Sequence, residues 1–404
     1  MCSSKRLIIA IIACLVPCAG AVEAQATKKT RETAPSRQPQ GVSIQKLRAA
    51  VRADPRDAEA RNALGLALGK SGQLNPAVAE FREAVALKPD YLEAWTNLGA
   101  ALEQKGDLEG ALEAIRKAVD LSPGDAELRL SLGSLLRRQQ RLDDAIAEFR
   151  QAAKLKPDSA EAYANEGFIL AQLGDLEGSM KSFEDAIKVK PDLAEAHYFL
   201  GNGKLLTGDI AGAIASLREA VRLKPNDEIS LQALGAALLR RATPEDLAEA
   251  VAVMRRAVKL KPQSADALIS LGVALRESGK AEESIPVLRE AVKLKPSLIE
   301  ARNNLGLSLL GAGSYDEAIS ELREAIKLDD ENASAHLDLG MALMRKGDVA
   351  LDEAVEQFEA ATKLDPESAQ AWYQLSAALE KKGQTAAAQE ALRKAEQLDP
   401  KLKK

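Results

Sequence analysis

Cysteine and histidine, the side chains that most often serve as nucleophiles, general bases and zinc ligands, are scarce in this chain. Its 3 cysteines are Cys2, Cys14 and Cys18, and its 2 histidines, His197 and His336, lie far apart in the sequence. The H-E-x-x-H, P-loop, G-x-S-x-G and G-x-G-x-x-G motifs of metalloprotease, nucleotide and nucleophile sites are missing. The sequence therefore predicts no disulfide framework, no metal site, no cofactor and no enzyme activity.

The composition points to a folded chain with an ordinary core. Of its 404 residues, 46% are hydrophobic and 28% charged, which excludes wholesale disorder. Only 3% are aromatic, and the net charge is −5. A nucleic-acid-binding protein normally shows a basic stripe, so we expect no nucleic-acid partner. The length suits two or three ordinary domains or one long array.

Residues 1–26 have the pattern of an export signal. Lys5 and Arg6 precede an apolar run, Leu7–Val16, and small residues follow at 19–26. The run is shorter than the roughly 20 apolar residues that a membrane-spanning helix needs. Cleavage at a small residue predicts a periplasmic or extracellular protein. The stretch before Cys14 also resembles a bacterial lipobox, which would leave a membrane-anchored lipoprotein with Cys14 as its lipidated residue, and an uncleaved anchor is a third reading. Residues 27–41 are almost devoid of apolar side chains and are expected to form a flexible linker.

From residue 58 the sequence repeats itself about every 34 residues, in phrases such as AVALKPD, AAKLKPD and AIKVKPD. Ten copies fill residues 58–402, and residues 403–404 form a short tail. The sixth copy carries extra residues near 242–244, and the ninth carries extra residues near 349–350. The predicted repeats begin at Ala58, Leu92, Ala126, Ala160, Ala194, Glu228, Ala265, Ile299, Ala333 and Ala369. A period of this length indicates stacked units that share one continuous core.

Within each copy the apolar spacing is helical. In the second copy Trp95, Leu98 and Leu102 form one stripe, Gly106 interrupts it, and a second stripe runs to a proline. Asp158 and Glu161 have the spacing of a capping box at a helix start. Each copy is therefore expected to form two antiparallel helices joined by a turn. Residues 42–57 match only the second helix, which predicts an N-terminal capping half-repeat.

Small residues recur where the two helices must approach each other. Position 8 of a copy is glycine in nine copies, position 20 is alanine or serine, and position 27 is always alanine. With the large residues between them, these positions resemble the tetratricopeptide repeat, and the resemblance covers residues 58–402. The family implies an all-α, right-handed superhelical solenoid whose inner groove, lined by the first helices, binds peptides or protein segments.

The resemblance places positions 2, 5, 6, 9, 12 and 13 of each copy on or near this groove. The lysine that some members carry at position 5 to bind acidic peptide ends is missing here. A ladder of asparagines at position 6, which holds extended peptides in other members, is partly present, with Asp338 and Gln374 as near substitutes. Phe168, Tyr198 and Phe199 make repeats four and five our preferred site, with packing between first helices as an equal alternative. The candidate groove residues are Asn97, Arg137, Arg138, Asn165, Phe168, Tyr198, Phe199, Asn202, Asn304, Leu307, Met341 and Met344.

Four positions depart from the repeat. Glu166 and Lys204 replace leucines at core positions of adjacent copies. They form either a compensating ion pair or two side chains that reach water separately. His197 and His336 both occupy position 4, where other copies have Trp or Tyr, so we expect them to pack rather than to bind a ligand.

The sequence favours an exported scaffold or adaptor that binds protein segments in its groove. The alternatives are an accessory subunit of an envelope assembly or of a glycosyltransferase system, and a structural protein that self-associates through its incompletely capped C-terminal end. A catalytic domain would need a long non-repeat segment, which the sequence lacks.

Overall fold

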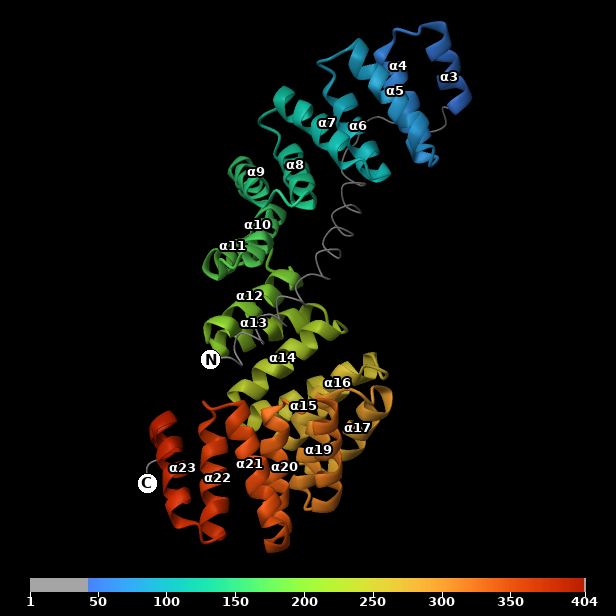
Figure 1. Ribbon diagram of the computed structural model, residues 1–404. Helices are drawn as coiled ribbons and strands as arrows, with labels where there is room; N and C mark the ends of the chain where they lie inside the picture. The colour runs from blue at the N-terminus through green and yellow to red at the C-terminus, as the bar shows by residue number, and fades with distance from the viewer. Residues whose placement is uncertain (1–42, 403–404) are drawn as a thin grey trace. The chain divides into compact units, whose positions relative to one another are not determined.

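A computed structural model describes residues 43–402. Across that range every regular element is helical, with 21 α-helices, two short 3₁₀ turns and no strand (Figure 1). The chain divides into two compact units, residues 1–207 and 208–404. No helix within the described range is long and apolar enough to cross a membrane.

The first unit consists of consecutive helices that pack against their neighbours in the chain (Figure 1). Helix α3 stands alone at the N-terminal end, and antiparallel pairs follow it. The helices are α3 (Ile44–Ala53), α4 (Ala58–Lys70), α5 (Leu74–Leu87), α6 (Leu92–Lys105), α7 (Leu108–Leu121), α8 (Ala126–Arg138), α9 (Leu142–Leu155), α10 (Ala160–Leu173), α11 (Leu176–Val189) and α12 (Ala194–Thr207).

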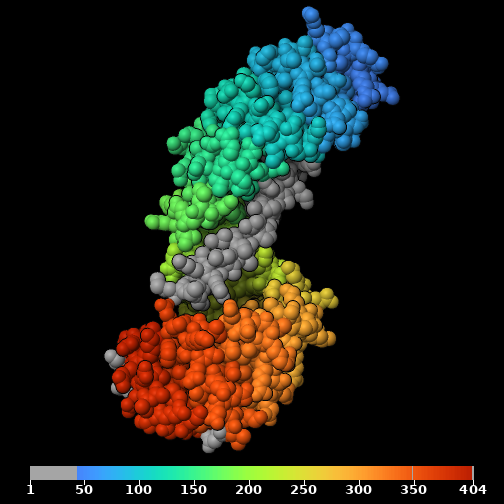
Figure 2. Space-filling model, in the orientation of Figure 1, coloured from blue at the N-terminus to red at the C-terminus, as the bar shows by residue number. Residues whose placement is uncertain are grey.

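The second unit continues the same arrangement, and its pairs form a continuous surface in the space-filling view (Figure 2). The helices are α13 (Ile210–Leu223), α14 (Glu228–Arg241), α15 (Pro244–Leu260), α16 (Ala265–Glu277), α17 (Ala281–Leu294), α18 (Ile299–Gly311), α19 (Tyr315–Leu328), α20 (Ala333–Lys346), η1 (Asp348–Ala350), α21 (Leu351–Leu364), α22 (Ala369–Lys381), α23 (Thr385–Leu398) and η2 (Pro400–Leu402). Across both units the even-numbered helices α4–α22 begin at the ten residues where the sequence places the repeat starts. We call these the first helices and their odd-numbered successors the second helices.

Glycine at position 8 brings the two helices of a pair together. The ring of Phe149 in α9 lies so near Gly133 of α8 that a Cβ atom there would come within 2.7 Å of it. Gly65 faces Phe81 and Gly306 faces Leu322 in the same way. Because the large side chain of the second helix occupies the place of a missing side chain on the first, each pair buries its core at close range.

In seven of the ten repeats, the side chain at position 4 bonds the turn that precedes the first helix. The indole Nε1 of Trp95 donates a hydrogen bond to the Pro89 carbonyl oxygen at 2.9 Å. Arg129 Nε bonds the Pro123 carbonyl at 3.1 Å, and His197 Nε2 lies 2.9 Å from the Pro191 carbonyl. The same contact recurs at Arg61, Arg302, His336 and Trp372. Both histidines therefore belong to the structural framework of the repeats.

The helix ends follow the local sequence with one correction. Gly106 ends α6 with a φ of 88°, a left-handed conformation that glycine adopts without strain. The capping box that we expected from Asp158 and Glu161 is wrong, because the hydroxyl of Ser159 accepts the bond from the Ala162 amide at 3.3 Å. Serine stands one residue closer to the helix, where its short side chain reaches the free amide.

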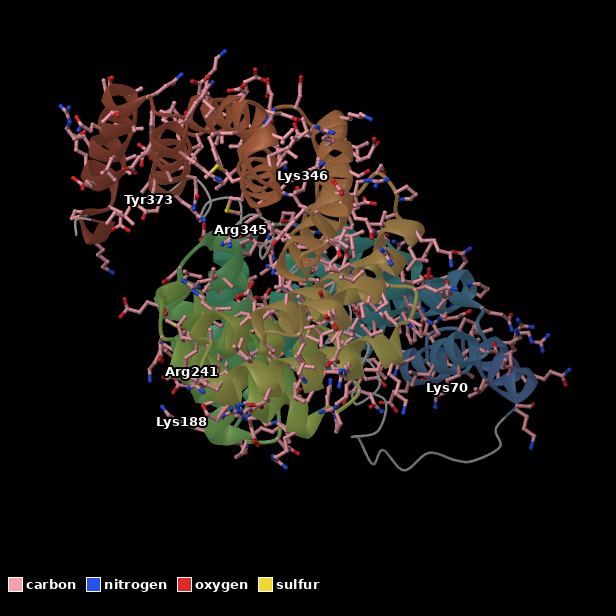
Figure 3. All side chains as sticks on the ribbon, turned by 90° about the horizontal axis from the view of Figure 1, so that it is seen from below. Lys70, Lys188, Arg241, Arg345, Lys346 and Tyr373 are labelled. Atoms are coloured by element: carbon pink, nitrogen blue, oxygen red, sulfur yellow. The ribbon has the colours of Figure 1, made fainter. Side chains whose placement is uncertain are left out.

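The insertion in the sixth repeat lies beside an ion pair between a buried aspartate, Asp246, and the partly exposed Arg241, which is labelled in Figure 3. The Asp246 carboxylate, 1% exposed, accepts bonds from Arg241 at 2.5 and 2.6 Å and shares a capping box with Thr243. The Arg241 guanidinium holds the pKa of Asp246 far below its usual range, although burial opposes this effect. The extra residues thus create a firm start for α15, which is longer than the other second helices.

Adjacent second helices of the second unit are joined by arginine–glutamate pairs. Position 25 of one repeat supplies the arginine, and position 19 of the next supplies the glutamate. The pairs are Arg218–Glu249, Arg255–Glu283, Arg289–Glu317 and Arg323–Glu353. Exposed pairs of this kind contribute up to about 1 kcal/mol each.

Glu166, which stands where other repeats have leucine, forms an ion pair with Arg150, an arginine at position 25. Arg150 stands at position 25, but position 19 of the next repeat is Gly178, so the ladder glutamate is missing there. Arg150 Nε instead donates to Glu166 Oε1 at 2.7 Å, and the glutamate side chain is 12% exposed. Of the two alternatives that the sequence left open for Glu166, the ion pair with Lys204 is therefore wrong, because the partner of Glu166 is Arg150. Lys204 lies half-buried in α12.

Candidate functional site

A cavity of about 590 Å³ opens on three successive first helices of the second unit, α18, α20 and α22. We call it the acidic cavity, because its lining includes two carboxyl groups and no lysine, arginine or histidine. It is lined by Ile299, Glu300, Asn303, Asn304, Leu307, Asn332, Ser334, Leu337, Asp338 and Gln370. Asn304 and Leu307 are candidate residues of the sequence analysis, and the structure brings them together here.

An amide and an arginine organise one wall of the acidic cavity. Asn304 Nδ2 donates to the Glu300 carbonyl oxygen at 2.9 Å, and Asn304 Oδ1 accepts from Arg276 Nη1 at 3.0 Å. Arg276, in the preceding first helix α16, also pairs with Glu277 at 3.0 Å. The guanidinium of Arg276 is therefore held between Asn304 and Glu277. Its bond to Asn304 Oδ1 orients the side-chain amide of Asn304.

Asp338 is the buried carboxyl group of the acidic cavity. The residue is 8% exposed and accepts no hydrogen bond from any other residue in the range 43–402. Burial raises the pKa of Asp338 to about 7, and the charge of Arg276 only partly opposes this rise. Near neutral pH the carboxyl therefore exchanges between its neutral and charged forms.

The rim of the acidic cavity adds a second acid and an unused acceptor. Glu300 has an exposed surface, yet enough protein surrounds its carboxyl that desolvation, followed by the Asp266 charge, raises its pKa. The buried Oδ1 of Asn303 has no hydrogen-bond partner within the described range. The cavity is thus lined by two carboxyl groups, and one amide oxygen beside it stays buried without a donor among the described residues.

The asparagines predicted to form a ladder differ in what they contact. Asn97 Nδ2 in α6 donates to Asn62 Oδ1 in α4 at 2.9 Å, and Asn62 in turn donates to the Tyr91 hydroxyl at 3.2 Å. Asn165, which is buried, donates to the Glu161 carbonyl of its own helix at 3.0 Å. Asn97 therefore joins two neighbouring repeats, whereas Asn165 bonds its own helix, as Asn304 does through the Glu300 carbonyl.

The aromatic residues of repeats four and five contact one another. Phe168 meets Phe199 edge-on, with ring centroids 4.3 Å apart, and Phe183 stacks on Phe199 at 5.4 Å. Tyr198 lies against Phe199 at 4.9 Å and is half-buried. Phe199 is buried, as the packing alternative requires. Asn202 beside it is buried too, and its Nδ2 has no partner among the described residues.

The remaining candidate residues lie at the ends or flanks of first helices. Arg138 Nη1 pairs with Glu103 Oε1 at 2.6 Å, and Arg137 is half-buried beside it. Met341 and Met344 of α20 are half-buried and pack against the core of the second unit. No group of three or more His, Cys, Asp or Glu side chains within residues 43–402 could hold a metal ion.

Sequence reasoning included Asp338 only as a substitute in the asparagine ladder and did not select Glu300 or Asn303. A signal was present, since the three residues occupy positions 6, 2 and 5, which the family resemblance assigns to the groove. What the sequence could not show is which polar side chains find a partner after folding.

Among solved structures, the chain is similar in fold to YrrB, described as a TPR protein with an unusual peptide-binding site. The two share 21% identity over 47% of this chain and 98% of that one, with a TM-score of 0.43. MamA shares 25% identity over 44% and 95%, with a TM-score of 0.40. Yeast Tom70 shares 16% identity over 84% and 92%, with a TM-score of 0.37. A search of curated proteins finds no match.

Family profiles described as tetratricopeptide repeat match residues 63–126, 179–228, 232–299 and 303–353. Further profiles of the same kind match residues 133–174 and 350–383, and residues 160–193 and 369–402. The matches cover most of the chain and agree with its succession of helix pairs, so the protein belongs to the tetratricopeptide repeat family.

Proposed function

We propose that the protein is an exported, non-catalytic scaffold that binds extended segments of partner proteins on the face of its first helices. Membership of the repeat family supports a protein-interaction scaffold. The observation that carries the proposal is the acidic cavity, which opens across three first helices and is lined by the carboxyl group of Asp338, to which no described residue donates a hydrogen bond. An extended peptide has backbone amides and side chains that such an acceptor can bind.

Two leucines of the same repeat, one on its first helix and one on its second, can test whether peptides bind on the face of the first helices. Leu307 of α18 lines the acidic cavity, whereas Leu328 of α19 lies 45% exposed on the second helix. Decapeptides selected on the purified protein from a random library are labelled, and their binding is measured by fluorescence anisotropy. We expect Leu307→Arg to weaken binding at least about tenfold, because it fills the cavity, and Leu328→Arg to leave binding unchanged. Failure to select any peptide, or equal effects of the two changes, would contradict the proposal.

Export is the second part of the proposal, and its support is the charged, apolar and small-residue pattern of residues 1–26. These residues lie outside the described range. Intact-mass analysis of the protein from the envelope fraction of a bacterial host tests this part. Removal of the first 21, 24 or 26 residues indicates signal cleavage, and a diacyl or triacyl mass on Cys14 indicates a lipoprotein. An unprocessed chain in the cytoplasmic fraction would refute export.

A further inference from the structure

The acidic cavity contains a buried carboxyl group, that of Asp338, to which no residue in the described range donates a hydrogen bond. Asp338 is 92% buried, since only 8% of it is exposed. A buried carboxylate without a partner is costly, so such groups are normally paired or neutralised. Asp338 keeps its carboxyl oxygens on the wall of an open cavity. A ligand that enters the cavity can therefore supply the missing partner.

The surrounding groups decide which kind of ligand fits. Glu300 adds a second carboxyl at the rim, and the buried Oδ1 of Asn303 is an acceptor without a donor. The nearest cation in the neighbouring helix, Arg276, is already bonded to Asn304 and Glu277. The cavity lining therefore carries two carboxyl groups and no cationic side chain, while its amide and hydroxyl groups can either donate or accept hydrogen bonds. This charge disfavours an acidic ligand and favours a cation.

We propose that the acidic cavity is a specificity pocket for a lysine or arginine side chain of the bound partner segment. This inference rests on the proposed peptide-binding function and adds the chemistry of the residue that is recognised. The partner's ammonium or guanidinium group pairs with the Asp338 carboxylate, and Glu300 adds a second negative charge at the rim. The apolar side chains of Ile299, Leu307 and Leu337 line the same cavity and contact the methylene groups of the basic side chain.

Binding of a cation and of a proton at Asp338 must exclude each other. The free carboxyl is largely protonated at pH 6 and largely ionised at pH 8, because its pKa is about 7. The other charged groups near it are Arg276 on α16, Glu300 on α18 and Asp266, which faces Glu300. His336 shares α20 but contacts Gln357 and the Asp330 carbonyl. If Asp338 dominates, affinity for a basic peptide rises by about tenfold between pH 6 and pH 8.

The test uses a decapeptide library in which one position at a time is fixed as lysine, arginine, norleucine or glutamate. Binding to the purified protein is measured by anisotropy at pH 6 and pH 8. We expect lysine or arginine at one position to bind at least about fivefold better than norleucine at pH 8, with glutamate weakest. Asp338→Asn removes both the preference and its pH dependence, whereas the exposed control Glu356→Gln on α21 keeps them.

A second variant keeps the test independent of any change in folding at Asp338. Gln370 is exposed and lines the cavity from α22, and Gln370→Lys places a resident cation there. We expect this variant to lose the lysine or arginine preference, whereas the exposed control Glu356→Gln keeps it.

The outcomes separate the two proposals. If no peptide of any composition binds, the proposed function fails, and this inference fails with it. If peptides bind without a basic preference, or if Asp338→Asn retains that preference, only the pocket assignment is overturned. A preference for glutamate would also overturn it. A pH dependence that persists in Asp338→Asn assigns the titration to another group and overturns the role of Asp338.

Discussion

Replacing Asp338 by asparagine should stabilise the second unit, and the gain should grow with pH. Asparagine has nearly the shape of the protonated carboxyl but never ionises. In the folded protein the pKa of Asp338 is raised from 3.8 to about 7. The folded state therefore binds the proton more tightly than the unfolded state, so stability falls as pH rises from about 4 to 7 and stays low above this window.

The size of the gain follows from the same two values. Each pH unit in that window is worth about 1.4 kcal/mol. The ionised carboxyl therefore costs about 4 kcal/mol at pH 8 and about 1.5 kcal/mol at pH 5. We expect Asp338→Asn to raise the free energy of unfolding by about these amounts, so that the gain at pH 8 exceeds that at pH 5 by about 2.5 kcal/mol.

Urea unfolding followed by tryptophan fluorescence can measure this difference. The chain has 2 tryptophans, Trp95 in the first unit and Trp372 in the second. Trp95→Phe leaves Trp372, on α22, as the reporter of the unit that changes. Glu356→Gln removes an exposed charge from α21 and controls for the general effect of net charge. A gain that is equal at the two pH values, or larger at pH 5, would refute the assignment of a buried, unpaired carboxyl at Asp338.

Three further changes test the packing and ion pairs of the repeats. Gly133→Ala should cost about 1–3 kcal/mol in urea unfolding, because its Cβ would overlap a phenylalanine ring, whereas Gly124→Ala, with no atom within 4 Å of the added Cβ, should be nearly neutral. A double-mutant cycle of Arg150→Leu and Glu166→Leu should give a coupling of about 1 kcal/mol, and additive effects would show that the pair contributes nothing. Asp246→Ala should cost about 3 kcal/mol at pH 7. Since the folded-state pKa of Asp246 is depressed, that cost should shrink as pH falls below about 4, and a constant cost would argue against an ionised partner.

Much of the fold was predictable because it repeats. Nine of the ten copies have a glycine at position 8, and nine have a proline near their end. When the copies are aligned, such recurring residues mark the same helix boundary again and again, so the prediction of each helix is supported by all the others. The role of position 4 was only partly visible, since Trp95, Arg129 and His197 look unrelated as residue types. They share one property, a nitrogen that reaches the carbonyl oxygen six residues earlier, and only coordinates display that contact.

The candidate site was less predictable. The sequence favoured the aromatic residues of repeats four and five, with packing as an equal alternative, and in the structure the ring of Phe199 packs against those of Phe168 and Phe183. It offered a Glu166–Lys204 ion pair as one of two alternatives, on the basis of opposite charge. In the structure Arg150 contacts Glu166 instead, and position 19 of the next repeat, which would carry the ladder glutamate, is Gly178. Charge and residue type are local, but the choice of partner depends on which side chains neighbouring helices bring within a few ångströms.

The sequence by itself determined the helix pairs, the starts of the first helices and the family, because each of these depends on spacing along the chain. The tertiary structure alone decided that Asp338 would be buried without a donor while Asn304, one repeat earlier at the same position, would be held by Arg276. Equivalent positions in a repeat share a place on the helix face but not their neighbours. Desolvation and hydrogen bonding act between neighbours, so the chemistry of the cavity becomes visible only when α16, α18, α20 and α22 are packed together.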